Sequence, residues 1–189
     1  MRSETMKHDD YTLIGIDGGA TKVSGWIVNY LSEENSYCLS EHHAELPYAS
    51  IEGHVTDFSP VEIQKQLPQR ESGKIYITDE ESVQGQTYIE ATARVVQELY
   101  ALVGEKPLLI GIGMPGLKTT DQRGINALDN GPLMPEYCTY LEKKLTASGL
   151  NLLTPVARLG SDADYCGVGE FYAAEGSFRN INNAYYLGG

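Results

Sequence analysis

The sequence predicts an α/β domain in which a mixed β-sheet carries helices on its faces. Three observations lead to this prediction: short apolar runs end in glycine-rich turns, segments with helical periodicity separate the later runs, and a tight turn joins the first two runs. The expected order is therefore two or three strands followed by helix, strand, helix, strand, helix and a last strand.

The first two expected strands form an antiparallel hairpin. Residues 11–16 are a short apolar run, and residues 23–30 are rich in residues that favour strands. The connection from Asp17 to Lys22 contains two adjacent glycines, which tolerate the backbone of a tight turn. A third strand near residues 36–40 would complete a meander.

The pattern weakens between residues 42 and 82, where we expect an insertion or a set of mobile loops. This stretch contains three prolines, and residues 74–78 could form a strand inside it. Its histidines lack the spacing of known metal motifs, so we expect them to be solvated loop residues. They are His42, His43 and His54.

Helical periodicity returns in three later segments. Apolar residues recur at spacings of three and four over residues 88–103, and Gly104 ends this helix. Pro135 begins a second helix that ends near Ser148, and residues 162–174 form a third. The strands expected beside these helices cover residues 107–113, 156–159 and 183–187.

Composition excludes several classes of partner. The 189 residues include 26 acidic and 14 basic side chains, which gives a formal net charge of -12. Such a charge disfavours binding to nucleic acid and to anionic membranes. No apolar run approaches the roughly 20 residues that span a bilayer, and the polar residues 1–10 are no secretory signal. Three scattered cysteines favour free thiols, so we expect a cytoplasmic protein.

The first chemically suggestive motif is the turn of the hairpin. Backbone N–H groups around Gly18 and Gly19 could hold phosphate oxygens, helped by the Thr21 hydroxyl and the Lys22 ammonium group. Asp17 could bind a divalent cation, either directly or through water. The alternative is a β-turn without a ligand.

The second motif, Gly111 to Gly116, lies where a strand leaves the sheet. Ligands of open α/β sheets bind at the carboxyl ends of strands, so the small residues of this turn could line a pocket. The alternative is tight packing between strand and loop.

Two further motifs follow later strands. Asp162 comes directly after Ser161 at the start of a helix, where it is either a first-turn or capping residue or a catalytic base that accepts a hydroxyl proton. Gly188 and Gly189 follow the last expected strand and could form a second backbone site for phosphate.

Together and in this order, the motifs resemble the ROK family (repressor, open reading frame, kinase). That family has Asp-x-Gly-Gly-Thr-Lys, then Gly-x-Gly-x-Pro-Gly, then Asn-Asp-Ala-Asn running on to Gly-Glu, and then a strand that ends in Gly-Thr-Gly. The resemblance covers nearly the whole chain apart from residues 42–82. It implies a ribonuclease H-like lobe of the actin-like ATPase superfamily.

The resemblance also implies an ATP-dependent sugar kinase, with ATP and Mg²⁺ as cofactors and a hexose or hexosamine as substrate. Asp162 would be the general base that activates a sugar hydroxyl for attack on the γ-phosphate, and Asp17 would lie near Mg²⁺. The implied phosphate site comprises Asp17, Gly18, Gly19, Thr21, Lys22, Gly188 and Gly189. The implied sugar site comprises Gly113, Pro115, Gly116, Asn130, Ser161 and Asp162.

The sequence departs from the family pattern in three respects. Ala20 stands where glycine is usual, and Ser161 replaces the usual asparagine, which changes one expected sugar contact. The resemblance also implies a second lobe that would begin at residues 184–189. We therefore expect a polar leader of ten residues, followed by an N-terminal lobe over residues 11–183. We expect this fragment to be inactive alone. Any homodimer would form through the second lobe.

Two alternatives remain. A non-catalytic, sugar-sensing regulator of the same family would carry a helix-turn-helix module before the first motif, and the ten residues before Tyr11 are too few for one. A relative of N-acetylglucosamine kinases and activator ATPases would also accept Asp-Gly-Gly in the first motif. The later motifs fit this second alternative less well.

Overall fold

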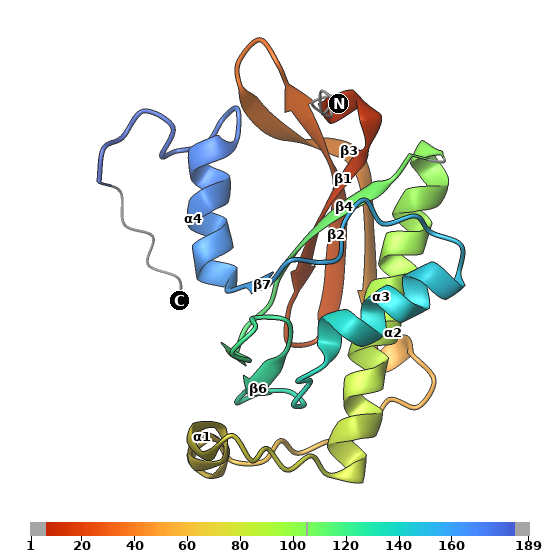
Figure 1. The fold of residues 1–189 in the computed structure, drawn as a ribbon, viewed down its shortest axis with the longest axis vertical. Helices are drawn as coiled ribbons and strands as arrows, with labels where there is room; N and C mark the ends of the chain where they lie inside the picture. The colour runs from red at the N-terminus through yellow and green to blue at the C-terminus, as the bar shows by residue number, and fades with distance from the viewer. Residues whose placement is uncertain (1–6, 105, 184–189) are drawn as a thin grey trace, which may run out of the picture.

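The computed structural model describes residues 7–104 and 106–183, and it confirms the predicted α/β fold with a mixed sheet (Figure 1). The main sheet has five strands in the order β3-β2-β1-β4-β7. The strands are β1 (Thr12–Gly18), β2 (Lys22–Leu31), β3 (Ser36–Pro47), β4 (Leu108–Gly113) and β7 (Leu159–Gly160). The first three pair antiparallel, whereas β4 and β7 run parallel to β1.

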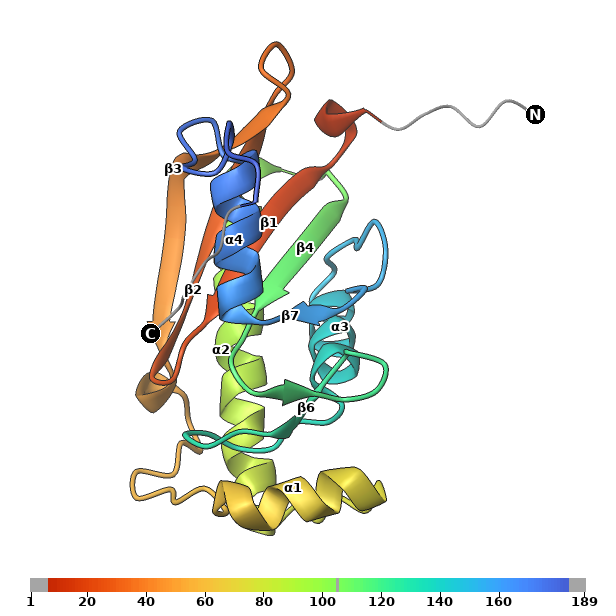
Figure 2. The same cartoon turned by 90° about the vertical axis from the view of Figure 1, so that its left-hand side faces the viewer.

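Helices cover both faces of the sheet. Figure 2 shows α4 (Asp162–Tyr172) on one face and α2 (Asp79–Val103) with α3 (Tyr137–Ala147) on the other. The remaining helix, α1 (Ile63–Ser72), contacts a small hairpin at the end of the molecule where α2 begins (Figure 1). That hairpin consists of β5 (Leu117–Lys118) and β6 (Ile125–Ala127). Short 3₁₀ turns occupy His8–Asp10 and Tyr48–Ser50.

The core lies between the sheet and α2. A Cβ on Gly25 of β2 would come within 2.8 Å of Ile16 Cδ1 and Val95 Cγ1, so the absence of a side chain there lets α2 approach the strand closely. Leu99 of the same helix is fully buried. Close packing of this kind is sensitive to the loss or gain of a single methylene group.

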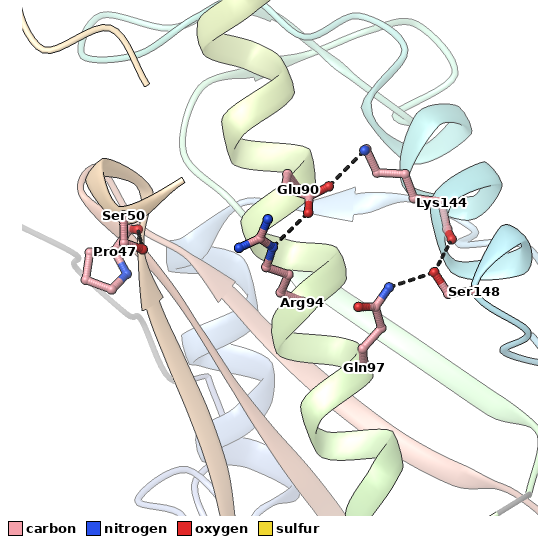
Figure 3. A network of polar contacts seen from close by, with 7 residues as sticks. All are labelled: Pro47, Ser50, Glu90, Arg94, Gln97, Lys144 and Ser148. Carbon is pink, nitrogen blue, oxygen red and sulfur yellow. Dashed lines mark hydrogen bonds and ion pairs between the residues drawn. The ribbon is translucent and has the colours of Figure 1, made fainter. Parts of the chain in front are cut away.

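The contact between α2 and α3 adds polar interactions at its exposed edge. Glu90 accepts hydrogen bonds from Lys144 at 2.8 Å and from Arg94 at 2.7 Å, and Gln97 donates to Ser148 at 2.9 Å (Figure 3). The contacts of Glu90 with Lys144 and of Gln97 with Ser148 join α2 to α3 and to the residue that follows it, whereas the contact of Glu90 with Arg94 lies within α2.

Three predictions about residues 42–82 were wrong in detail. Strand β3 continues to Pro47, so His42 and His43 lie in a strand and not in a loop. Residues 63–72 form a helix, and residues 74–78 form no strand. The last error arose because Ile75 and Ile77 alternate as in a strand, whereas Thr78 caps the following helix.

Helix α2 begins at Asp79, before the predicted start at Tyr88. Its first turn is fixed by a capping box: Thr78 accepts a hydrogen bond from the Glu81 backbone N–H, and the Glu81 side chain accepts one from the Thr78 backbone N–H. The first nine residues of α2 bury the polar side chains of Glu81, Gln84 and Thr87 instead of large apolar ones. Apolar periodicity therefore could not reveal them.

The later elements follow the predictions more closely. Strand β4, the turn after it, α3 and α4 all form where expected, although β7 has only two residues. The expected strand at 183–187 and the glycines Gly188 and Gly189 lie outside the described residues. Of the cysteines on helices, Cys138 of α3 is buried and Cys166 of α4 is exposed. Within the described ranges, no helix is both long and apolar enough to cross a membrane.

Candidate active site

The parallel strands bring three of the predicted motifs to one edge of the sheet. Asp17 at the end of β1 pairs with Gly113 at the end of β4, and Gly113 pairs with Gly160 at the end of β7. The chain leaves these strands as Gly18-Gly19, Met114-Pro115-Gly116 and Ser161-Asp162, respectively. Carboxyl ends of parallel strands are where open α/β sheets bind ligands.

A cavity of about 570 Å³ opens beside the first two of these turns. Five predicted site residues line it: Gly18, Gly19, Pro115, Gly116 and Asn130. Five others do not line it: Asp17, Thr21, Lys22, Gly113 and Ser161. The remaining lining residues are Ala20, Ile63, Leu67, Tyr88, Met114, Leu117, Ile125, Ala127, Leu128 and Asp129. Its walls are thus mostly apolar, and Asp129 and Asn130 supply an exposed carboxylate and an exposed amide.

Two stacked tyrosines hold the first turn. The Tyr48 hydroxyl donates to the Gly19 carbonyl at 3.2 Å, and the Tyr88 hydroxyl donates to the Ala20 carbonyl at 2.9 Å. Their ring centroids are 3.6 Å apart. In a trans peptide the N–H points opposite to the C=O, so the N–H groups of Ala20 and Thr21 point away from the tyrosines. That orientation suits an anion on the outer side of the turn.

Burial keeps both tyrosines protonated and able to donate. It raises the pKa of Tyr88 to about 12, and it raises the pKa of Tyr48 further, with smaller contributions from Tyr137, Tyr88 and Asp17. Both hydroxyls therefore stay protonated, and able to donate to the turn, into the alkaline range where an ordinary tyrosine ionises.

Lys22 lies beside a carboxylate. Its Nζ donates to Glu45 Oε2 on β3 at 2.5 Å, and Ser24 donates to the same oxygen at 2.9 Å. The hydrogen bonds from Lys22 and Ser24 lower the pKa of Glu45. An anion bound at the first turn would therefore meet a lysine whose charge Glu45 already balances.

The second turn is fixed by a lysine and a glycine. Lys118 Nζ donates to the carbonyls of Met114 at 2.6 Å, Pro115 at 3.2 Å and Gly116 at 2.8 Å. Gly116 has φ +88°, and a Cβ there would lie 2.7 Å from the Ala127 carbonyl oxygen. Both the left-handed backbone and the crowding require glycine at this position. Because Gly116 has no side chain, the turn can pack directly against the hairpin strand β6.

The third turn begins α4. Ser161 is the N-cap of this helix, because its hydroxyl accepts a hydrogen bond from the Asp164 N–H at 3.0 Å. Asp162 follows as the first helical residue, and its side chain lies outside the described part of the structure. The ring of Tyr165 packs against Gly160 and Gly113, and a Cβ on Gly160 would overlap it. Helix α4 is thereby set against the ends of β4 and β7.

Metal ligands are sparse. The described residues contain no group of three or more histidine, cysteine, aspartate or glutamate side chains that could hold a metal ion. Asp17, at the end of β1, is exposed. A single carboxylate fits Mg²⁺, which keeps much of its water and shares substrate phosphates, better than it fits a tightly chelated metal.

Sequence reasoning missed the helical wall of the cavity. Ile63 and Leu67 of α1 line it, although this stretch was expected to be a loop. Their spacing of four residues is a helical signal, but Pro60 and Pro68 obscured it. Tyr88 was recognised only as the start of an apolar helix face, and nothing in the sequence shows that its hydroxyl reaches the first turn.

No family model and no curated protein matches this chain. Solved structures do match. The inorganic polyphosphate/ATP-glucomannokinase from Arthrobacter sp. strain KM is 19% identical over 92% of this chain, with a TM-score of 0.54. A ROK family glucokinase from Streptomyces griseus, solved with glucose and AMPPNP, is 16% identical over 89% of the chain and 38% of its own, with a TM-score of 0.49.

The match to the glucomannokinase confirms the predicted α/β fold with a mixed sheet, because this chain shares its fold with part of that protein. The chain spans about half of that protein, 52% of its length. At this level of identity the likeness concerns the fold, so chemistry has to be argued from the residues of this chain.

Proposed function

We propose that the chain is the sugar-binding lobe of an ATP-dependent sugar kinase, and that the cavity binds a hexose or hexosamine. The observation that carries this proposal is the convergence of three turns at the aligned ends of β1, β4 and β7, beside a cavity with apolar walls. Apolar walls with a few polar groups are typical of small-molecule sites. Asp129 and Asn130 would supply hydrogen bonds to sugar hydroxyls.

Asp162 would act as the general base. A carboxylate in this role accepts the proton of the acceptor hydroxyl while the hydroxyl oxygen attacks the γ-phosphorus of ATP, and ADP leaves. Its place in the chain supports this role, because it follows β7, which pairs with β4 at the same edge as the cavity turns. Ser161 is engaged as a helix cap, so we assign it to fixing the start of α4, where Asp162 is the first helical residue.

The first turn would receive the phosphates of ATP. The N–H groups of Ala20 and Thr21, which point away from the two tyrosines, would donate to phosphate oxygens, and the Thr21 hydroxyl would add a donor. Asp17 would hold Mg²⁺ through water. When bound, Mg²⁺ neutralises charge on the phosphates, and ATP supplies the transferred group.

Complete phosphoryl transfer would need a second lobe, because the chain corresponds to about half of the glucomannokinase. We therefore expect these 189 residues to bind sugar but to transfer no phosphate. Incubation with ATP, Mg²⁺ and D-glucose, followed by detection of the sugar phosphate, tests this expectation. Steady turnover would refute it.

Sugar binding can be tested on the chain itself. We would titrate it with D-glucose, D-mannose and N-acetyl-D-glucosamine and follow backbone amide signals by NMR. Binding should shift the signals of residues 18–20 and 128–130, and Asn130→Leu should weaken binding at least tenfold. Asn151→Leu replaces an exposed asparagine far from the cavity lining and should change nothing. Failure of all three sugars to bind would overturn the proposal.

Asp162 needs a separate test. In any form of the protein that turns over, Asp162→Asn should abolish phosphoryl transfer, because an amide cannot accept the hydroxyl proton. The same change should weaken sugar binding only severalfold, because it alters one hydrogen bond. Unchanged turnover would show that another residue is the base.

A further inference from the structure

Helix α1 is attached to the domain in an unusual way. Its apolar residues Ile63 and Leu67 line the cavity, and Leu67 remains 37% exposed. The one side chain of α1 that is buried belongs to Gln66, which is 1% exposed. A polar side chain therefore docks this helix, while its apolar side chains face the site.

Gln66 pairs with a single peptide segment across the cavity wall. Its side-chain amide donates to the Leu128 carbonyl at 2.9 Å, and its side-chain oxygen accepts from the Leu128 N–H at 2.7 Å. The same amide also donates to the Val61 carbonyl, just before the helix. Arg70 adds a neighbouring contact, from its Nε to Asn126 Oδ1 at 3.1 Å.

This pairing fixes the direction of the segment that follows. Leu128 is succeeded by Asp129 and Asn130, the exposed carboxylate and amide of the cavity lining. With both its N–H and its C=O engaged by Gln66, Leu128 cannot rotate without breaking two buried hydrogen bonds. No apolar residue could replace glutamine, because the Leu128 peptide requires a donor and an acceptor on the same side chain.

We propose that Gln66 is a positioning residue for the site: it holds Leu128 so that Asp129 and Asn130 point to the ligand, and it thereby couples α1 to ligand affinity without touching the ligand. The proposal rests on the sugar site proposed above. It adds that residues 63–72 tune that site, although the resemblance to the kinases did not include them.

The test compares three variants of the 189-residue chain. Gln66→Met keeps the size of the side chain but removes donor and acceptor. Gln66→Glu keeps an acceptor for the Leu128 N–H and regains a donor only when its carboxyl is protonated. Position 66 is buried, and burial raises the pKa of a carboxyl, so more of it is protonated at pH 6 than at pH 8. Gln64→Met changes an exposed glutamine of the same helix and is the matched control. Each variant is titrated with D-glucose at pH 6 and pH 8, and Leu128 amide exchange is measured by NMR.

Gln66→Met should raise the Kd for glucose at least tenfold and accelerate Leu128 amide exchange at least tenfold, while α2 amides keep their protection. Gln66→Glu should bind glucose more tightly at pH 6 than at pH 8, relative to the wild type at each pH. A residue that merely stabilised the fold would not produce this rescue. Gln64→Met should match the wild type.

Two results would overturn the proposal. One is an unchanged Kd in Gln66→Met together with faster Leu128 exchange. The other is a Kd for Gln66→Glu that does not depend on pH. If the wild-type chain binds no glucose, the sugar-site proposal fails by itself. The amide signals of Asp129 and Asn130 then decide the positioning role, which requires them to shift in Gln66→Met and to stay unchanged in Gln64→Met.

Discussion

Helices α2 and α1 show how differently one chain can attach two helices. Helix α2 buries a long apolar face against the sheet, including Val95, Val96 and Leu99. Helix α1 buries one glutamine and leaves its two apolar side chains on the cavity. Because apolar burial is the main stabilising term of a fold, α2 contributes mainly to the stability of the domain. The apolar side chains of α1 lie outside the core, so they can contact a ligand in the cavity.

The largest expected contrast is in stability. Leu99→Ala should reduce the free energy of unfolding by about 2–5 kcal/mol, because Leu99 is fully buried and the truncation leaves a cavity. Leu67→Ala should change it by no more than about 0.5 kcal/mol, because Leu67 faces the site. Urea unfolding of both variants measures the difference. Equal losses would mean that α1 is as much a part of the core as α2.

The two helix N-termini offer a second contrast. Thr78→Ala should cost about 0.5–2 kcal/mol, because it removes the side-chain cap of α2. Glu62 precedes α1 and makes no side-chain cap bond, so Glu62→Ala should cost less than about 0.5 kcal/mol. Thermal and urea unfolding provide the measurement. A large effect of Glu62→Ala would weaken the claim that α1 is held mainly by Gln66.

Tyr88 belongs to the scaffold helix but reaches the site, so it tests where the two regions meet. Tyr88→Phe should cost about 0.5–1.5 kcal/mol, because the Ala20 carbonyl loses its donor. It should also shift the amide signals of Ala20 and Thr21. Tyr140→Phe, at an exposed tyrosine of α3, is the control and should leave those signals in place. Unshifted signals in Tyr88→Phe would show that the turn holds its shape alone.

The smallest expected difference is a pH dependence. Hydrogen bonds from Lys144 and Arg94 lower the pKa of Glu90 below its ordinary value of 4.5. A lowered pKa in the folded state means that the stabilisation is present above pH 4.5 and is lost as the pH falls through the lowered pKa. For a partly exposed ion pair it amounts to about 0.2–1 kcal/mol.

Urea unfolding of the wild type and of Lys144→Met measures this contribution. The stability gap between the two proteins at pH 6.5 should shrink at pH 3. By contrast, the contacts of Gln66 with Leu128 and of Arg70 with Asn126 involve amides and an arginine, which do not titrate in this range. The difference in unfolding free energy between the wild type and Gln66→Met should therefore be the same at pH 6.5 and pH 3. If the stability difference between the wild type and Lys144→Met were the same at both pH values, the effect of Lys144 would come from packing and not from its ion pair with Glu90.

Much of the fold could be predicted because it follows from local rules. The Asp-Gly-Gly turn predicts the hairpin, and the apolar run before Gly111 predicts the strand that pairs with β1. Apolar periodicity failed where the buried face is polar, as at Glu81 and Gln84 of α2. Pro60 and Pro68 obscured the helix that contains Gln66, and its buried residue is also polar: Gln66 docks the helix through a hydrogen bond with a residue 62 positions away.

The site could be predicted in part. Gly18, Gly19, Pro115 and Gly116 line the cavity and could be predicted from the turns that follow two apolar strands. Asn130 also lines it and was expected only from the family resemblance. The hydrogen bonds of Tyr48 and Tyr88 to the first turn depend on long-range packing, which no local pattern encodes. The pairing of Lys22 with Glu45 likewise depends on the register of β2 with β3.

The two-residue strand β7 has a consequence for the order in which this molecule opens. Its pairing with β4 involves only two residue pairs, whereas β1 and β4 share six. Among the residues that the structure describes, none after Asn130 lines the cavity. Opening of β7 and α4 should therefore be a sub-global event of low free energy that removes Asp162 from the sheet edge and spares the cavity. Binding of the sugar to the cavity and placement of Asp162 at the sheet edge would then be two separate equilibria. In native-state hydrogen exchange, the amides of α4 should exchange through an opening of lower free energy than the amides of β1.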